Sequence, residues 1–534
     1  MEFQIADMFE AVVDTVPSDE ALVCAAQGRA ELRMTYAELD ARANRAANAF
    51  RGLGIGVGDH VGIHLFNCSE WIESMLGLFK LRAVPVNVNY RYVAEELSYL
   101  FADADLRAVV TEPEFEAPIE QIRPGLPLLD HVVVRGQAYE QLLAAAGGPR
   151  PRVDGRSADD LYLLYTGGTT GMPKGVVWRH EDIYFASLGG RGTPSRGLPP
   201  LKRADEVVER ARQGDPIKRR LPLCPLMHGG AQWIALETLL NGGALVLDVD
   251  RHFDAPNALQ VLSDERVELT MLIGDATARP LADALSSDGD RFDLSALQVL
   301  ASGGAIMSPA VKEQLRRLLP RTKVVDTFGA SETGGQGRLS AQSAGGALRL
   351  VTDENTTVFD SDRRPVLPGS GTTGKLARRG WIPLGYYKDP GKTAETFPVI
   401  DGVRWSIPGD DAIVEGDGEI VLLGRGAMSI NTGGEKVFPE EVEGAIKRHP
   451  TVFDALVVGV PDPRFGQRVA AVVSFRKDAE PPTDDELAKS VRSHVSGYKV
   501  PRTWVRVAQC ERLPTGKPDY SWAREVAMST AEDR

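Results

Sequence analysis

The sequence predicts an α/β protein with a large N-terminal domain of helix-covered sheets and a small α/β domain at its C-terminus. The 534 residues are too many for one hydrophobic core. Short apolar strands alternate with amphipathic helices up to about residue 140, which is typical of parallel sheets covered by helices. Beyond Arg425 the pattern becomes a compact set of strands and helices, which divides the chain into domains 1–426 and 427–534.

Local signals along the chain justify the individual elements. Thr35 and Glu38 are spaced as a capping box, followed by a helix that places apolar residues on one face. Residues 71–81 read as a buried helix, and residues 244–247, 269–273, 297–300 and 323–325 read as strands. In the small domain, Thr483 and Glu486 predict a second capped helix.

Composition excludes several classes of protein. A net charge of −13 argues against a nucleic-acid surface or a polybasic membrane patch. The four cysteines lie far apart, which excludes zinc-ribbon spacing and a disulfide framework and suits a reducing cytoplasm. The N-terminus has no signal-peptide pattern, and no apolar run is long enough for a transmembrane helix.

A segment rich in glycine and threonine, residues 165–175, lies between two apolar runs. Glycines let backbone N–H groups converge on an anion, threonine hydroxyls add donors, and a lysine adds a positive charge. The spacing fits neither the Walker loop nor the dinucleotide fingerprint, and an ordinary turn between strands is the alternative. The candidate phosphate-binding residues are Thr166, Gly167, Gly168, Thr169, Thr170, Gly171 and Lys174.

The segment resembles the phosphate loop of the adenylate-forming superfamily, which includes acyl-CoA synthetases, adenylation domains and luciferases. Gly168 replaces the usual serine, which removes one hydroxyl donor. Residues 326–332 resemble a second motif of that superfamily, with Phe328 available to stack on adenine and Glu332 to hold Mg²⁺, a cation that prefers oxygen ligands. The resemblance implies further ATP- and AMP-binding residues: Gly303, Gly304, Asp326, Thr327, Gly329, Ser331, Asp410, Arg425 and Lys517.

The same resemblance assigns the remaining site residues. Lys517 is implied as the lysine that catalyses adenylation, with Glu332 and His228 as the other catalytic candidates. The acyl pocket is implied to contain His228, Gly229, Gly230 and Trp233, and the CoA channel Thr432 and Gly434. At the hinge between the domains, Ala427 replaces the usual aspartate or lysine, which puts in doubt how easily the small domain rotates.

Residues 189–220 interrupt the alternation of strands and helices with many glycines, prolines and basic residues. The sequence favours a solvated loop with a short helix around residues 204–212. The alternative is a basic surface that guides a polyanion such as CoA.

The resemblance covers nearly the whole chain and implies an AMP-forming acyl-CoA synthetase of the fatty-acid–CoA ligase type. Its substrates would be ATP, CoA and a fatty or steroid side-chain acid, with Mg²⁺ as cofactor. It also implies a distorted barrel within the large domain and a mobile small domain. The alternatives are an adenylation enzyme that loads a carrier protein, a luciferase-like oxygenase and a non-catalytic nucleotide-binding regulator. A homodimer is compatible with the sequence.

Overall fold

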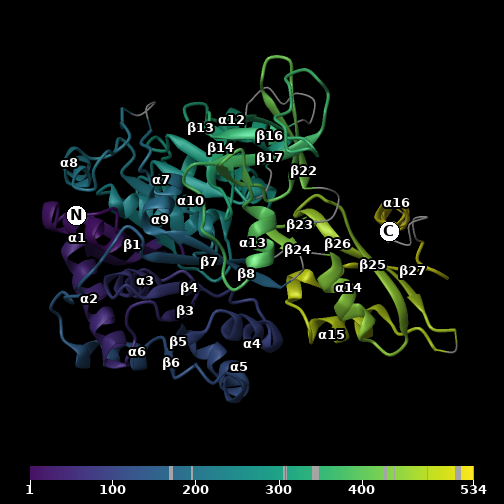
Figure 1. The fold of residues 1–534 in the computed structure, drawn as a ribbon, viewed down its shortest axis with the longest axis horizontal. Coiled ribbons are helices and arrows are strands. Elements are labelled where there is room, and N and C mark those ends of the chain that lie inside the picture. Colours follow the sequence, from purple (N-terminus) through teal and green to yellow (C-terminus); the bar gives the residue numbers. More distant parts are fainter. Residues whose placement is uncertain are drawn as a thin grey trace.

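The computed structural model has a large lobe followed by a small C-terminal lobe (Figure 1). It describes residues 1–167, 172–193, 197–304, 307, 309–339, 348–425, 430–437, 439–477, 479–511 and 519–532. The α/β class with a large and a small domain is thereby confirmed. The boundary expected between residues 426 and 427, like Ala427 itself, lies outside the described residues and stays a prediction.

A seven-stranded sheet forms one layer of the large lobe. Its strand order is β18-β8-β7-β4-β3-β5-β6, and β7, β4, β3, β5 and β6 run parallel. The strands are β3 (His60–His64), β4 (Val84–Asn87), β5 (Leu106–Thr111), β6 (His131–Val134), β7 (Leu161–Gly167), β8 (Pro173–Arg179) and β18 (Gly385–Tyr386). The intervening helices are α3 (Ser69–Lys80), α4 (Ala94–Asp103), α5 (Pro113–Ile122) and α6 (Gln137–Ala146), with a 3₁₀ turn at Arg123–Gly125.

A fifteen-stranded sheet carries the centre of the large lobe. Strands β1, β10, β9, β11, β12 and β13 are parallel, and antiparallel strands continue from β13 to the other edge. In chain order the strands are β1 (Glu20–Ala26), β2 (Arg29–Thr35), β9 (Arg219–Pro222), β10 (Ala244–Asp248), β11 (Leu269–Leu272), β12 (Val299–Ser302), β13 (Lys323–Ala330), β14 (Gly334–Leu339), β15 (Leu348–Val351), β16 (Thr356–Phe359), β17 (Gly374–Arg379), β19 (Val399–Ile400), β20 (Val403–Ser406), β21 (Asp410–Val414) and β22 (Ile420–Arg425).

Helices fill the space around these two sheets. The remaining helices of the large lobe are α1 (Ile5–Thr15), α2 (Tyr36–Gly52), α7 (His180–Ser187), α8 (Glu206–Gln213), α9 (Gly229–Leu240), α10 (Ala255–Asp264), α11 (Gly274–Asp288), α12 (Pro309–Leu318) and α13 (Pro390–Thr396), with a 3₁₀ turn at Gly289–Arg291. The largest apolar core joins α1, α2, α3 and α9 to both sheets. The described helices include none that combines the length and the apolarity needed to cross a bilayer.

The small lobe is a five-stranded sheet with three helices, and α14 and α15 lie together (Figure 1). Its strands are β23 (Ile430–Thr432), β24 (Glu435–Val437), β25 (Val452–Asp462), β26 (Gly466–Phe475) and β27 (Thr503–Arg506). Its helices are α14 (Pro439–Lys447), α15 (Asp484–Arg492) and α16 (Tyr520–Glu532), with a 3₁₀ turn at Gly497–Lys499.

Both predicted capping boxes are present. The side chain of Thr35 accepts the N–H of Glu38 while the Glu38 carboxylate accepts the N–H of Thr35, and Thr483 and Glu486 repeat the arrangement at α15. Two strands differ from the prediction, and β12 begins two residues later than expected, at Val299. β13 does not end at residue 325 but continues to Ala330, because its second half pairs with β14. Residues 326–330, the first part of the second motif, therefore belong to this strand.

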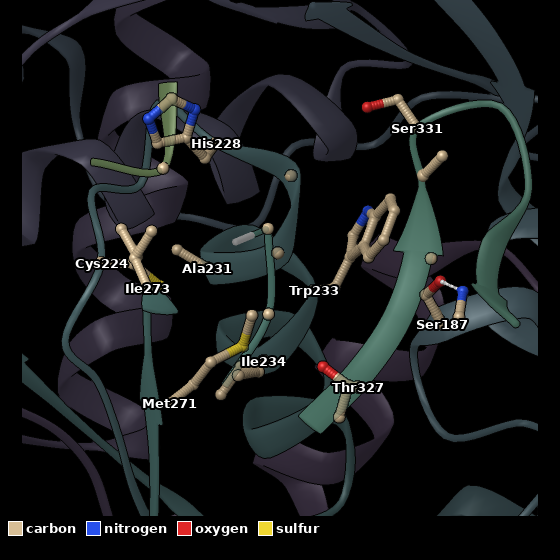
Figure 2. Close-up of a pocket in the computed structure, with 18 of the residues that line it drawn as sticks. Ser187, Cys224, His228, Ala231, Trp233, Ile234, Met271, Ile273, Thr327 and Ser331 are labelled. Carbon is tan, nitrogen blue, oxygen red and sulfur yellow. Dashed lines mark hydrogen bonds between the residues drawn. The ribbon is translucent and has the colours of Figure 1, made fainter. Parts of the chain in front are cut away.

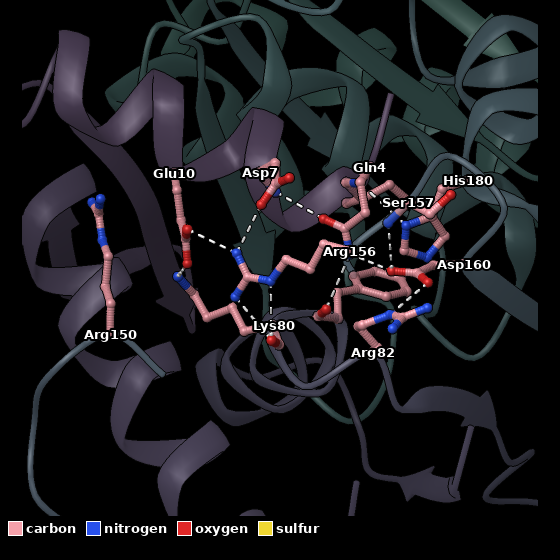
Figure 3. A network of polar contacts seen from close by, with 12 residues as sticks. Gln4, Asp7, Glu10, Lys80, Arg82, Arg150, Arg156, Ser157, Asp160 and His180 are labelled. Atoms are coloured by element: carbon pink, nitrogen blue, oxygen red, sulfur yellow. Dashed lines mark hydrogen bonds and ion pairs between the residues drawn. The ribbon is translucent and has the colours of Figure 1, made fainter. Parts of the chain in front are cut away.

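A buried ionic network attaches the N-terminal helix to the large lobe (Figure 3). The Lys80 side chain is 0% exposed, and its ammonium lies 2.6 Å from Glu10 and 2.7 Å from Asp40. Arg156 binds Glu10 and Asp7 from the other side, and Arg150 binds Asp40. Burial alone would raise the pKa of Asp40, but Lys80 and Arg150 outweigh it and lower that pKa.

Replacing Lys80 with methionine should lower the free energy of unfolding by about 3 kcal/mol, because two carboxylates lose a cation that water cannot replace. Arg150 and Arg156 remain, which keeps the loss near the low end of the range for broken buried pairs. Urea unfolding followed by tryptophan fluorescence measures the shift. Arg203→Ala, which breaks an exposed pair with Asp205, is the control and should unfold at nearly the same urea concentration as the wild type. Equal shifts for the two variants would contradict this account.

Candidate active site

A cavity of about 570 Å³ opens between the large lobe and the small lobe. Its walls come from the start of α9, from one face of the parallel strands, from β13 and β14, and from the small-lobe residues Gly434, Glu435, Lys436, Tyr498 and Lys499. Figure 2 shows His228 at one side of this cavity and Ser331 at the other, with Trp233 between them. Ligands of open α/β sheets bind outside the carboxyl ends of the strands, which is where these side chains lie.

The strands contribute alternate residues to the cavity, as the period of two in a β-strand requires. The wall residues are Leu269 and Met271 of β11 with Ile273 just beyond it, and Val299 and Ala301 of β12 with Gly303 just beyond it. A Cβ at Gly303 would stand 2.6 Å from Cε of Met271, so a larger residue would push the end of that side chain aside. The deep part of the cavity is therefore mostly apolar.

The predicted acyl-pocket residues all line the cavity. His228 precedes α9, and Gly229, Gly230 and Trp233 lie in its first turns. A Cβ at Gly229 would stand 2.5 Å from Cδ2 of Leu164, so a larger residue would have to displace that side chain or the helix. The structure thus brings together the four residues that the sequence could only link by resemblance.

Most of the predicted nucleotide residues that are described line the same cavity. They are Thr166, Gly303, Gly304, Thr327, Phe328, Gly329, Ser331 and Glu332. Glu332 accepts a hydrogen bond of 3.0 Å from the hydroxyl of Tyr386, and Ser331 accepts one of 3.0 Å at its backbone oxygen from the indole N–H of Trp178. Gly168, Thr169, Thr170, Gly171 and Lys517 lie outside the described residues.

Five predicted nucleotide residues do not contribute to the described wall of this cavity. Lys174 makes an ion pair of 2.7 Å with Asp389. Asp326 is paired with Lys312 and faces a second cavity of about 600 Å³. Asp410 and Arg425 are neighbours in the register of β21 and β22. Gly167 ends β7 beside Pro173.

The tip of the β23–β24 hairpin reaches from the small lobe into the cavity. Gly434 has φ +87°, and a Cβ there would stand 2.0 Å from Cγ2 of Ile273. The next residue, Glu435, lies 3.2 Å from Nε2 of His228 and pairs with Arg91. Burial alone would raise the pKa of Glu435, but His228 and Arg91 hold it at about 2. Thr432 is buried in β23 and is not part of the described wall, so only Gly434 of the two predicted CoA-channel residues borders the cavity.

Further side-chain pairs between the lobes help to hold the small lobe in this orientation. Lys499 and Glu96 are both buried and lie 2.6 Å apart, Ser496 donates a hydrogen bond to Glu96, and Arg448 lies 3.0 Å from Glu95. Sequence reasoning assigned no role to Glu435, Arg91, Glu96 or Lys499. The only signal for Glu435 was its place directly after Gly434 in a strongly family-like stretch, and the other three had none.

The basic segment 189–220 is mostly neutralised within the described chain. Arg191 binds Asp353, Arg219 binds Glu20 and Glu265, and Arg220 binds Asp215 and Glu237. The short helix α8 forms close to its predicted range. These contacts favour a structural loop over a basic surface for a polyanion.

The cavity contains an oxygen ligand of the kind that Mg²⁺ needs beside a nucleotide. This ion usually binds one or two carboxylates together with phosphate oxygens and water. Glu332 supplies a carboxylate in the cavity wall, and its second oxygen is not used by Tyr386. The residues present therefore fit a magnesium–nucleotide complex.

Comparison with known proteins agrees with this geometry. Residues 9–387 match the family model of the AMP-binding enzyme, and residues 441–517 match that of the AMP-binding enzyme C-terminal domain. The 3-oxocholest-4-en-26-oate–CoA ligase of Rhodococcus rhodochrous is 45% identical over 98% of this chain and 96% of its own length. A medium/long-chain-fatty-acid–CoA/3-oxocholest-4-en-26-oate–CoA ligase of Mycobacterium tuberculosis is 44% identical over 99% of this chain and 97% of its own length.

Among solved structures, an amide bond synthetase from Marinactinospora thermotolerans superimposes with a TM-score of 0.80. It is 25% identical, and the match covers 97% of this chain and 99% of that one. The two family models together span most of the sequence, and the matches to relatives run over nearly their full lengths. The chain therefore belongs to the AMP-binding enzyme family.

Proposed function

We propose that the protein is an ATP-dependent acyl-CoA synthetase that acts on fatty or steroid side-chain acids. One observation carries the proposal: a single cavity joins the nucleotide-motif residues, a deep apolar pocket and the tip of the small-lobe hairpin. Such a cavity can hold a carboxylic acid with its carboxylate beside a nucleotide and its tail among apolar side chains. Relatives at 44–45% identity carry names of CoA ligases for acids of these two kinds.

In the first half-reaction, a carboxylate oxygen attacks the α-phosphorus of ATP, and pyrophosphate leaves as the acyl-adenylate forms. Negative charge builds on the phosphate oxygens, and fixed cations and hydroxyl donors stabilise it. We assign these roles to Thr169 and Thr170, to Lys517, and to Lys174, whose ammonium would have to leave Asp389 to reach a phosphate. Magnesium held at Glu332 would supply further positive charge at the phosphates.

In the second half-reaction, the CoA thiolate attacks the acyl carbon and AMP leaves. The hairpin position supports a route for the thiol along Gly434, because this residue packs on Ile273 at the cavity wall. Glu435 would hold the hairpin there through His228 and Arg91. Lys517 would have to withdraw for the thiol to enter, so we propose that the small lobe rotates between the two steps.

A panel of carboxylic acids, scored by release of AMP with and without CoA, tests the proposal. We expect AMP release that depends on a fatty or steroid acid, and a soluble acyl-CoA product when CoA is present. Adenylate formation without soluble thioester would indicate transfer to a carrier protein instead. A protein that binds ATP but exchanges no pyrophosphate with any acid would be a regulator, and the proposal would be wrong.

A cytoplasmic location belongs to the same proposal. Its support is that Cys24, Cys68, Cys224 and Cys510 are all buried free thiols, which suits a reducing compartment. A homodimer stays a prediction.

A further inference from the structure

Two charged residues line a cavity wall that is otherwise mostly apolar at its deep end. They are Arg220 of β9 and Glu237 of α9. Their neighbours in the wall include Leu269, Val299 and Ile234. Placing a carboxylate against an apolar pocket costs free energy unless a polar group binds it. The pair therefore indicates a polar ligand in this part of the cavity.

Strand register places Arg220 far from the reacting end of the cavity. It pairs with Leu269 in the sheet, and Leu269 pairs with Val299. Val299 precedes Gly303 by four positions on β12 and its extension, and a strand rises about 3.3 Å per residue, so the separation is about 13 Å.

The position of Glu237 along α9 puts it at a similar distance from the reacting end of the cavity. Gly229 begins α9, and Glu237 follows eight positions later, which at about 1.5 Å per residue is about 12 Å. Beyond its first two glycines, α9 is buried except at Trp233, Ile234 and Glu237, which share the face that lines the cavity. Two independent elements therefore put the charged pair at the distal end of the acyl pocket.

The hydrogen bonds of this cluster leave one acceptor open. Arg220 is fully buried, lies 2.9 Å from Oε1 of Glu237, binds Asp215 and donates to the backbone oxygen of Ile217. The buried cation of Arg210 lies in the same region, and within the described chain it binds only oxygens of Gly189, Pro199 and Asn241. The two arginines and the two carboxylates, Asp215 and Glu237, together carry no net charge. No donor in the described part of the chain reaches Oε2 of Glu237, although the Glu237 side chain keeps 23% exposure.

We propose that Glu237, held by Arg220, is a distal subsite that selects acids carrying a hydroxyl group at the end remote from the carboxylate. The hydroxyl would donate to Oε2 of Glu237. A methyl group there would shield this acceptor from water without giving it a hydrogen bond, and a carbonyl group would set one acceptor against another. This inference rests on the proposed function and specifies its substrate class.

The test compares three straight-chain acids of one length, matched to the pocket depth, that end in a methyl, a hydroxyl or an oxo group. A second comparison uses 3-oxocholest-4-en-26-oate and its 3-hydroxy counterpart. We expect the hydroxyl member of each set to have a kcat/KM for AMP release at least about 10-fold higher than its partners, because sites built to bind a hydroxyl reject analogues that lack it. Ratios between acids within one preparation do not depend on the fraction of folded enzyme.

Glu237→Gln tests the residue directly. The carboxamide can donate to a carbonyl, so the preference for hydroxyl over oxo should fall at least about 10-fold in this variant. Ile234→Val, on the same helix face, changes pocket volume alone and should leave that ratio within about twofold.

The inference is overturned if the wild-type enzyme treats the three end groups alike, or if Glu237→Gln leaves the ratio unchanged. Failure of the proposed function looks different, because then no acid of any kind would release AMP.

Discussion

Replacing Lys517 with alanine should abolish formation of the acyl-adenylate while leaving its conversion to acyl-CoA intact. The ammonium is assigned to the α-phosphate during attack by the carboxylate, and it is proposed to withdraw before the thiol attacks. Loss of a cation placed in this way lowers the rate by about 10³–10⁵-fold. Pyrophosphate exchange measures the first step, and thioester formation from supplied acyl-adenylate and CoA measures the second.

The matched control is Lys489→Ala, which removes an exposed lysine of α15 in the same lobe. Both half-reactions should proceed at wild-type rates in this variant. An equal loss of both half-reactions in Lys517→Ala would contradict the assignment, since it would mean that the lysine supports the fold of the lobe or both steps.

Replacing Gly434 with alanine should impair formation of acyl-CoA while leaving formation of the acyl-adenylate intact. A Cβ at this position would stand 2.0 Å from Cγ2 of Ile273, and the φ of +87° is unfavourable for any residue with a side chain. The hairpin could then no longer dock as observed, and Glu435 would move away from His228. A displacement of about 1 Å can cost roughly 10²-fold in rate, so thioester formation should fall by about that factor while pyrophosphate exchange persists.

Gly466→Ala separates backbone strain from loss of docking. Gly466 also has positive φ, +74°, but a Cβ there would meet nothing closer than 4.0 Å. This variant should be somewhat less stable yet keep both half-reactions. If Gly434→Ala lost pyrophosphate exchange as severely as thioester formation, the hairpin would be required for adenylation, and the assignment of the docked state to the second step would be wrong.

The two variants together test the proposed rotation of the small lobe. Lys517 and Gly434 belong to the same lobe, yet each should disable one step only. Loss of the first step alone in one variant and of the second step alone in the other is expected only if the lobe presents different surfaces to the cavity in the two steps. With a single fixed orientation, each variant would lose both steps.

The sequence by itself determined the elements and motifs that depend on neighbouring residues. Capping boxes at Thr35 and Thr483 need only residues three positions apart, and the helix near residues 71–81 follows from its apolar content. The Gly/Thr-rich segment and the residues around Phe328 and Glu332 were recognisable because their spacing is local. Even there, the predicted end of β13 was wrong, because pairing with β14 decides how far that strand extends.

Tertiary structure alone decided which distant side chains meet. Glu435 and His228 are 207 positions apart, and Glu96 and Lys499 are 403 apart, so no local pattern relates them. No local pattern singled out Glu237, and its place beside Arg220 at the end of a cavity follows from how α9 packs on β9. Local propensity acts within a few residues along the chain, whereas ion pairs and cavities depend on distances in space that only the packed fold sets.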